Sequence, residues 1–357
     1  MATINPKFGK DLKKYGAFNF NACYNCGNCT AVCSLSTADA SFPRELVRFT
    51  TLGLEDEIKT STKPWECYYC GECSTHCPQD ADPGELMMSL RRWLTAKYDW
   101  TGLSGLFYKY LPATILAMLA VLAGVIFFAD SVSWKLEKML HYGHIFEMVA
   151  IATVFVVIFI PNLLRMWYFT IIKSGTKASL KTYIIALRDL LVHMFTQKRA
   201  KDCDDNHFRW LEHLILVFAY LSLLFTTVVL NWFGTDSLFV VVLGYLESLF
   251  IFIITVDFVK DRIQKKKALA KKSQSSDWFF VIWLLLMGLT SLCVRLFIDL
   301  NILETNKWMY IFHLTVLAQW ALLIVPFGKW THFLYRSFAM YFVNIKELST
   351  PKKKAKK

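Results

Sequence analysis

Eight cysteines in the first eighty residues fall into two runs with the same spacing. The first run, NACYNCGNCTAVCS (residues 21–34), has the pattern C-x2-C-x2-C-x3-C, and CYYCGECSTHCP (residues 67–78) repeats it and ends in Cys-Pro. Three thiolates in a C-x2-C-x2-C loop can wrap one face of a cubane iron–sulfur cluster, and a more distant fourth thiolate completes the site. The two runs therefore predict two [4Fe–4S] clusters.

The fourth cysteine of each run is assigned to the opposite cluster, as in two-cluster ferredoxins. The first cluster is then predicted on Cys23, Cys26, Cys29 and Cys77, and the second on Cys67, Cys70, Cys73 and Cys33. Zinc sites usually combine two separated C-x2-C pairs, and a reducing cytoplasm disfavours disulfides, so both alternatives fit this spacing less well. Ser34 stands where a proline is usual, and Cys203 and Cys293 are interpreted as structural.

The remainder of the chain has a different composition from the segment that carries these cysteines. Of the 357 residues, 55% are hydrophobic and only 19% are charged, and the mean hydropathy is +0.36. This composition is too apolar for an ordinary soluble domain. We expect a cluster-binding head at residues 1–100, a membrane body at residues 101–345 and a basic tail at residues 346–357.

Six apolar segments of the body are long enough to span a bilayer as helices, which requires about 20 residues each. They lie near residues 106–129, 146–170, 209–232, 237–259, 278–299 and 308–335, and Pro161 and Pro326 are expected to kink two of them. The predicted fold is mainly α: an α-helical dicluster ferredoxin-type domain followed by a six-helix transmembrane cytochrome b bundle.

Basic residues flank these segments mainly on one side. They are concentrated between spans two and three, in KDRIQKKKALAKK (residues 260–272) and in the tail, whereas the opposite loops carry few. By the positive-inside rule, the head and both termini are expected to be cytoplasmic, and no secretory signal is recognised at the start. A nucleic-acid surface is a less suitable explanation of the net charge of +12, because the lysines flank spans.

Histidines in the spans could hold haem, to which electrons from membrane quinone could pass. No C-x-x-C is followed by His, which excludes covalent c-type haem and leaves non-covalent haem b. His313 and His332 are separated by about 28 Å of helix and cannot serve one haem. Depth therefore pairs His332 with His213 for an inner haem b and His313 with His144, or alternatively His141, for an outer one. The alternative is that each is an interfacial or core histidine.

Three other ionisable residues of the apolar segments could have a role in electron or proton transfer. Arg209 and Arg295 could meet haem propionates or extend to lipid headgroups. Glu247 falls near the middle of span four, where it is either a group for proton or quinol handling or a neutral, hydrogen-bonded glutamate. His193 and His207 are expected to be solvated, and His76 is expected to support the second cluster.

Particular motifs then indicate a family resemblance. CYNCGNCTAVC with FPRELVRF, and WECYYCGECSTHCP with ELMMSLRRWL, resemble the C subunit of heterodisulfide reductases. R-x-x-x-H on span three and H…PFGKWTHFLYRSFA on span six resemble the cytochrome b subunit of respiratory nitrate reductase and the heterodisulfide reductase E subunit. The combination is similar to the C subunit of the quinone-interacting membrane-bound oxidoreductases. One departure is that the position of the nitrate reductase cytochrome's second span-three histidine falls among Ser222, Leu223 and Leu224.

The resemblance implies a function in a prokaryotic inner membrane. Menaquinol would be oxidised in the membrane, and haem b and the clusters would deliver electrons to cytoplasmic flavin- and iron–sulfur-containing partner subunits. Adenylylsulfate reductase would be the further partner, with reversed flow in a sulfur oxidiser. The alternatives are a heterodisulfide-reductase-like subunit acting with a thiol–disulfide partner, and a membrane-anchored iron–sulfur redox sensor. A transporter fits less well, since the spans show no internal repeat.

Overall fold

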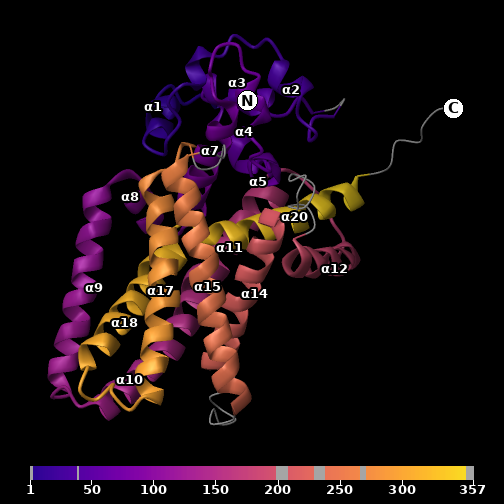
Figure 1. Cartoon of the computed structure of the whole chain (residues 1–357). Coiled ribbons are helices and arrows are strands. Elements are labelled where there is room, and N and C mark those ends of the chain that lie inside the picture. The colour runs from indigo at the N-terminus through magenta and orange to yellow at the C-terminus, as the bar shows by residue number, and fades with distance from the viewer. Residues whose placement is uncertain (1–2, 38–39, 198–207, 229–237, 266–270, 351–357) are drawn as a thin grey trace. The chain divides into compact units, whose positions relative to one another are not determined.

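The computed structural model describes residues 3–37, 40–197, 208–228, 238–265 and 271–350, so the predictions for Cys203, His207 and the end of the tail lie outside the described residues. The described residues form helices and no β-strand, which confirms the predicted mainly helical fold. The chain divides into two compact units (Figure 1). Unit 1 comprises Met1–Lys109, Ile160–Asp205 and Thr331–Lys357, and unit 2 comprises Tyr110–Phe159 and Asn206–Trp330.

Unit 1 combines the cysteine-rich head with three helical segments from the later part of the chain. Its helices are α1 (Phe8–Lys13), η1 (Phe20–Ala22), α2 (Asn28–Ala31), α3 (Arg44–Thr51), α4 (Glu55–Thr60), α5 (Lys63–Glu66), α6 (Glu72–Thr75), α7 (Pro83–Tyr98), α8 (Leu103–Lys109), α11 (Ile160–Trp167), η3 (Tyr168–Ile172), α12 (Leu180–Thr196) and α20 (Thr331–Ser349). The long helix α7 is buried along most of its length. Trp65 and Trp93 are completely buried in the core around it, together with Tyr335 of α20.

Unit 2 is a bundle of long apolar helices (Figure 1). They are α9 (Leu111–Ser131), α10 (Leu136–Thr153), η2 (Val154–Phe159), α14 (Phe208–Val228), α15 (Leu238–Gln264), α17 (Ser275–Asp299), α18 (Lys307–Gln319), η5 (Trp320–Ile324) and α19 (Val325–Phe327). Helices α14, α15, α17, α18 and α9 contact one another in that order. Large apolar side chains such as Leu116 and Phe127 are exposed on the outside of α9. Such surfaces suit contact with lipid rather than water.

Six helical segments of the described chain are long and apolar enough to cross a membrane. They run over Leu111–Ser131, Leu136–Ile172, Phe208–Thr226, Leu238–Gln264, Ser275–Asp299 and Lys307–Ser349. The predicted positions of the six apolar segments correspond to these helices. Pro161 and Pro326 each follow a π-helical turn, η2 and η5 respectively. Proline lacks an amide donor, so the change of hydrogen-bond register before it has a direct physical cause.

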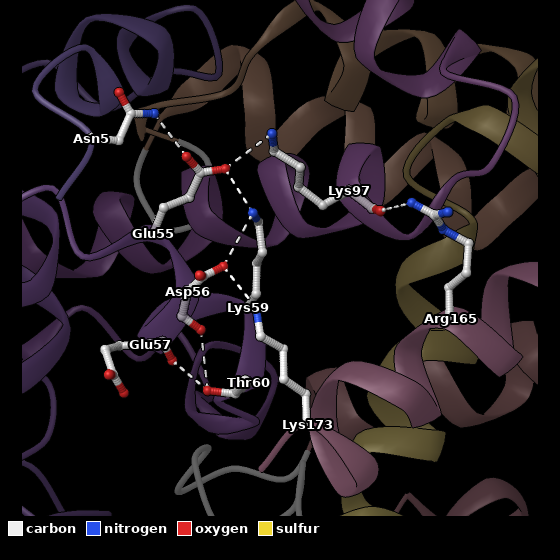
Figure 2. A network of polar contacts seen from close by, with 9 residues as sticks. All are labelled: Asn5, Glu55, Asp56, Glu57, Lys59, Thr60, Lys97, Arg165 and Lys173. Atoms are coloured by element: carbon white, nitrogen blue, oxygen red, sulfur yellow. Dashed lines mark hydrogen bonds and ion pairs between the residues drawn. The ribbon is translucent and has the colours of Figure 1, made fainter. Parts of the chain in front are cut away.

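A network of ion pairs connects the head to the segment Ile160–Lys173 within unit 1 (Figure 2). Glu55 accepts hydrogen bonds or ion pairs from Asn5 at 2.8 Å, Lys59 at 3.0 Å and Lys97 at 3.1 Å. Asp56 pairs with Lys173 at 3.0 Å. Burial opposes the ionisation of Glu55, but these hydrogen bonds together outweigh it and lower the pKa of Glu55 to about 2. Charged groups on α4 and α7, together with Lys173 directly after η3, therefore hold these elements together.

Candidate iron–sulfur and haem sites

The two cysteine runs have the same backbone conformation. The residue before the second cysteine of each run is left-handed, with φ of 68° at Asn25 and 60° at Tyr69. The glycine that follows that cysteine is also left-handed, with φ of 93° at Gly27 and 91° at Gly71. Glycine adopts this conformation without steric cost. A short helix, α2 or α6, begins directly after each glycine, so the sequence repeat is also a structural repeat.

Backbone amides donate to the sulfur atoms in both runs. The amide of Asn25 lies 3.4 Å from Cys23 Sγ, and the amide of Tyr69 lies 3.3 Å from Cys67 Sγ. The amide of Ala81 lies 3.3 Å from Cys77 Sγ. Such donors favour the thiolate form that binds iron and tune the reduction potential of a bound cluster. The loops thus fit an iron–sulfur cluster in donor chemistry as well as in spacing.

The fourth cysteine of each run lies near the other run. Cys33 interacts electrostatically with Cys67 and Cys70, and Cys73 interacts with Cys33. The matching contacts of the first run are those of Cys29 with Cys23, Cys26 and Cys77. The structure therefore brings together the two crossed sets that the sequence predicted. In the described part of the chain, no three His, Cys, Asp or Glu side chains converge as a single metal ion would require.

The cysteines differ in burial within each run. Cys29, Cys67 and Cys73 are buried, whereas Cys26 and Cys70 are exposed. Burial raises the pKa of the Cys73 thiol to about 12. Burial also raises the pKa of Cys67, although the nearby Arg91 guanidinium opposes this effect. Iron must displace these protons on binding, so assembly of the centre has to supply the energy of ionising buried thiols.

Side chains of α7 hold the second run in position. Arg91 donates to the carbonyl of Pro64 at 2.6 Å and to the carbonyl of Cys67. Glu85 accepts hydrogen bonds from Tyr69 Oη at 2.8 Å and from Arg92 at 2.9 Å. The sequence analysis did not single out these residues. A glutamate and two arginines among the apolar residues of ELMMSLRRWL were the available signal.

His332 lies on α20 within unit 1 and contacts Trp65, which precedes the second cysteine run. Its ring centroid is 5.9 Å from that of Trp65, which stands two residues before Cys67. The Trp65 ring also lies 5.6 Å from the ring of Tyr335. The predicted haem ligand His332 is therefore connected to the cysteine run through one aromatic side chain. Trp65 was not singled out from the sequence.

The other predicted haem ligands lie in unit 2. His313 on α18 is hydrogen-bonded through Nδ1 to Thr290 Oγ1 at 2.9 Å, which is the kind of contact that orients an iron-ligating imidazole. His144 lies on α10, and α10 packs on α18 where Tyr310 donates to the carbonyl of Met139 at 3.2 Å. His213 lies on α14. It belongs to unit 2, whereas His332 belongs to unit 1, and their pairing stays a prediction.

Glu247 is buried in the middle of α15, with 2% of its surface exposed. Its carboxylate accepts hydrogen bonds from Ser222 and from Thr226 of α14, the latter at 3.3 Å. Arg295 of α17 interacts electrostatically with it. Hydroxyl groups of α14 and a guanidinium of α17 therefore surround this buried carboxylate.

Comparison with known proteins supports the cysteine-based part of this description. Residues 22–81 match the 4Fe-4S dicluster domain family. The chain is 32% identical over 96 residues to a protein of Archaeoglobus profundus that is described as like the C subunit of heterodisulfide reductase. It is 35% identical over 83 residues to an iron–sulfur C subunit of the CoB–CoM heterodisulfide reductase of Methanocaldococcus jannaschii. No solved structure matches the chain.

These matches cover the N-terminal part of the chain. They include 27% of this chain and 51% of the Archaeoglobus protein, and 23% of this chain and 42% of the Methanocaldococcus protein. The chain therefore spans about half the length, or less, of these curated relatives. The N-terminal part is homologous to iron–sulfur subunits of an oxidoreductase complex, which supports the predicted iron–sulfur clusters.

Proposed function

We propose that this chain is the membrane electron-transfer subunit of a quinone-linked oxidoreductase. Electrons would pass between menaquinol and cytoplasmic flavin- and iron–sulfur-containing partner subunits, with adenylylsulfate reductase as the further partner in sulfur metabolism. When bound, haem b and the two [4Fe–4S] clusters supply one-electron carriers between the two-electron chemistry of quinol and that of the partner. The eight motif cysteines would hold the clusters, His213 and His332 the inner haem, and His313 with His144 an outer one.

The contact between Trp65 and His332 is the observation that carries this proposal. A cluster-binding run and a candidate haem ligand are joined through a buried ring, at a centroid distance of 5.9 Å, in a chain with six helices suited to a membrane. An iron–sulfur domain that is merely anchored by its helices would not need a histidine at this position. The contact therefore favours electron transfer between the membrane and the head over a simple anchoring role.

The same contact suggests an order for the two clusters. The second run, whose Cys67 follows Trp65 by two residues, would be nearest to His332. The first run carries exposed aromatic residues, with Tyr24 59% exposed and the nearby Phe18 61% exposed. Exposed aromatic side chains of this kind are typical of docking surfaces. We therefore assign the second run to the membrane-proximal position and the first run to the exit toward the partner.

Glu247 is proposed to accept a proton when quinol is oxidised. Each menaquinol releases two electrons and two protons, and a buried carboxylate is a suitable first acceptor for one of these protons. Ser222 and Thr226 donate to Glu247 and would hold its carboxylate in place. Ionisable groups inside membrane helices are costly and usually have a function, which supports this assignment.

The basic segments support a cytoplasmic location for the head. Lys177, Lys181 and Arg188 are exposed in the connection between the second and third candidate spans. Positive residues in such connections are typically on the cytoplasmic side. The proposed topology therefore gives the clusters access to soluble partners of the cytoplasm.

A direct test is quinol-driven reduction of the clusters. The full-length protein, reconstituted in lipid vesicles, should show cluster reduction when a menaquinol analogue is added without any partner subunit. His332→Ala should abolish this reaction while dithionite still reduces both clusters. His193→Gln, a substitution outside the proposed route, should behave as wild type. Equal quinol-driven reduction in His332→Ala and wild type would refute the proposed route.

The comparisons also favour a second candidate function. The matched relatives are subunits of heterodisulfide reductases, so the partner could act on a thiol–disulfide substrate instead of adenylylsulfate reductase. Purification of the intact complex from its membrane and identification of its soluble subunits separates the two candidates. A flavin-containing disulfide-reducing subunit would favour the second candidate, and co-purifying adenylylsulfate reductase would favour the first.

A further inference from the structure

The segment between the second and third candidate spans contains a 17-residue amphipathic helix, α12. From the sequence, its lysines indicated only a basic connection. The Ser179 side chain caps its start by accepting the amide of Thr182 at 3.3 Å. Ala186 and Leu190 are buried, and Tyr341 of α20 donates to the carbonyl of Tyr183 at 3.1 Å. One face of α12 is therefore packed against α20 within unit 1 (Figure 1).

A second apolar face of α12 is exposed. It contains a stripe of five large side chains at helical spacing: Leu180 (77% exposed), Ile184 (64%), Leu187 (45%), Leu191 (48%) and Phe195 (53%). At 100° per residue, these five positions occupy an arc of about 80° beside the packed face. Ile185 and Val192 are also exposed, farther round the helix from the packed face. An apolar stripe of this length is unusual on a surface that faces water, and it marks an interaction site.

Basic residues border the exposed stripe. Lys181 and Arg188 lie next to it on the helix surface, and both are exposed, as is Lys177 just before the helix. Asp189 is the only acidic residue between positions 173 and 197. It lies on the polar side and accepts a hydrogen bond from Asn344 at 3.3 Å. Long basic side chains beside an apolar stripe are suited to anionic lipid headgroups, because their stems lie on acyl chains while their charges reach phosphate.

The connection to the membrane is short. Only seven residues, 173–179, separate the apolar helical segment Leu136–Ile172 from Leu180. Eight steps along the chain, from Ile172 to Leu180, span at most about 29 Å when fully extended. Helix α12 is therefore held near the end of a candidate membrane span, where a bilayer surface is the neighbouring apolar phase.

We infer that α12 is an interfacial helix that lies in the headgroup region of an anionic membrane. The stripe from Leu180 to Phe195 contacts acyl chains, and Lys181 and Arg188 contact lipid phosphates. Through α20, which packs on α12 and carries His332, this contact also fixes the head-containing unit at the membrane surface. The inference does not depend on the proposed redox function, since it rests on exposure, spacing and charge.

The test measures the depth of single positions on α12 in the full-length, cluster-loaded protein. A cysteine is introduced at Ile184 in a Cys203→Ala/Cys293→Ala background, labelled with an environment-sensitive fluorophore and reconstituted in nanodiscs containing phosphatidylglycerol. Asp189→Cys, on the polar side of the same helix, is the matched control. Quenching by spin-labelled lipid is compared with quenching by aqueous iodide at each position.

The label at Ile184 is expected to be quenched several-fold more by lipid than by iodide, and the label at Asp189 is expected to show the reverse preference. A Leu187→Cys variant should reproduce the result for Ile184. Preferential quenching by iodide at both stripe positions would overturn the inference. If iodide reaches the stripe in the isolated chain and is excluded only when partner subunits are bound, the occupant is protein and the lipid assignment is wrong.

Discussion

The buried ion pair between Glu85 and Arg92 allows a quantitative prediction about the head. The two side chains are 6% and 7% exposed and lie 2.9 Å apart, and Glu85 also accepts the Tyr69 hydroxyl beside the second cysteine run. Glu85→Met removes the carboxylate and leaves the Arg92 charge buried. Breaking a buried pair in this way typically costs about 3–5 kcal/mol.

Hydrogen exchange of α7 in the full-length protein measures this cost. A loss of about 3–5 kcal/mol corresponds to roughly 100- to 4,000-fold faster exchange of the protected α7 amides, at about 1.4 kcal/mol per tenfold change. Asp11→Ala is the matched control, because the Asp11–Lys109 pair lies at 2.8 Å with side chains 32% and 24% exposed. Its loss should cost at most about 1 kcal/mol.

A double variant separates the cost of an unbalanced charge from the cost of changed packing. Glu85→Met combined with Arg92→Met replaces the pair with apolar side chains, and such replacements are often close to neutral. Exchange in the double variant should therefore return most of the way to wild type. The reasoning is refuted if Glu85→Met exchanges no faster than Asp11→Ala, or if the double variant is as labile as the single one.

Three further predictions concern the cysteine runs and the ion-pair network. Low-temperature EPR and iron analysis should show that Cys77→Ala and Cys29→Ala lose the same cluster and retain about four of about eight cluster iron atoms. Loss of different clusters by these two variants would disprove the crossed arrangement, and Cys293→Ala serves as the control. Gly27→Ala adds a Cβ 3.2 Å from Arg44 Nη1 at a φ of +93° and should destabilise the first run by about 1–3 kcal/mol, seen as faster iron release to a chelator. In α9, Gly124→Ala meets no atom within 4 Å and should release iron at the wild-type rate, so equal rates for both variants would contradict the strain argument. The Glu55 pKa is about 2 in the folded protein against its ordinary value of 4.5, so its ionised form contributes stability above about 4.5 that is lost as pH falls toward 2. Hydrogen exchange of α4, corrected for the intrinsic rate, should accelerate over this range in wild type but not in Glu55→Gln, and identical pH profiles would exclude Glu55 as the cause.

The fold and the cysteine chemistry could be predicted because both depend on local spacing. Apolar segments of span length specify helices through their composition alone, and the C-x2-C-x2-C runs specify their loop conformation through one glycine each. The crossed assignment of Cys33 and Cys77 rests on a general property of two-cluster domains and stays a prediction. The other features can be recognised without knowing which residues, distant in the sequence, contact one another.

The residues around the cysteines could not be predicted, because their roles arise from contacts between distant segments. Arg91 reaches the carbonyl of Cys67 across 24 positions. The ring of Trp65 contacts that of His332, which lies on α20 near the end of the chain. Helix α12 was not predicted, because the lysines of its segment led to an interpretation as a basic connection. Its apolar residues nevertheless recur at helical spacing. Contacts of this kind depend on tertiary packing, which single-sequence patterns do not contain.

The central claim is that one chain carries electrons between a membrane haem and two clusters. The most direct test is a dithionite-reduced minus oxidised optical spectrum of the anaerobically purified protein, with haem, non-haem iron and sulfide quantified on the same sample. The account predicts b-type haem bands together with about eight non-haem iron and eight sulfide per chain. A preparation with both clusters and no haem would contradict the proposed route from quinol through His332 to the head.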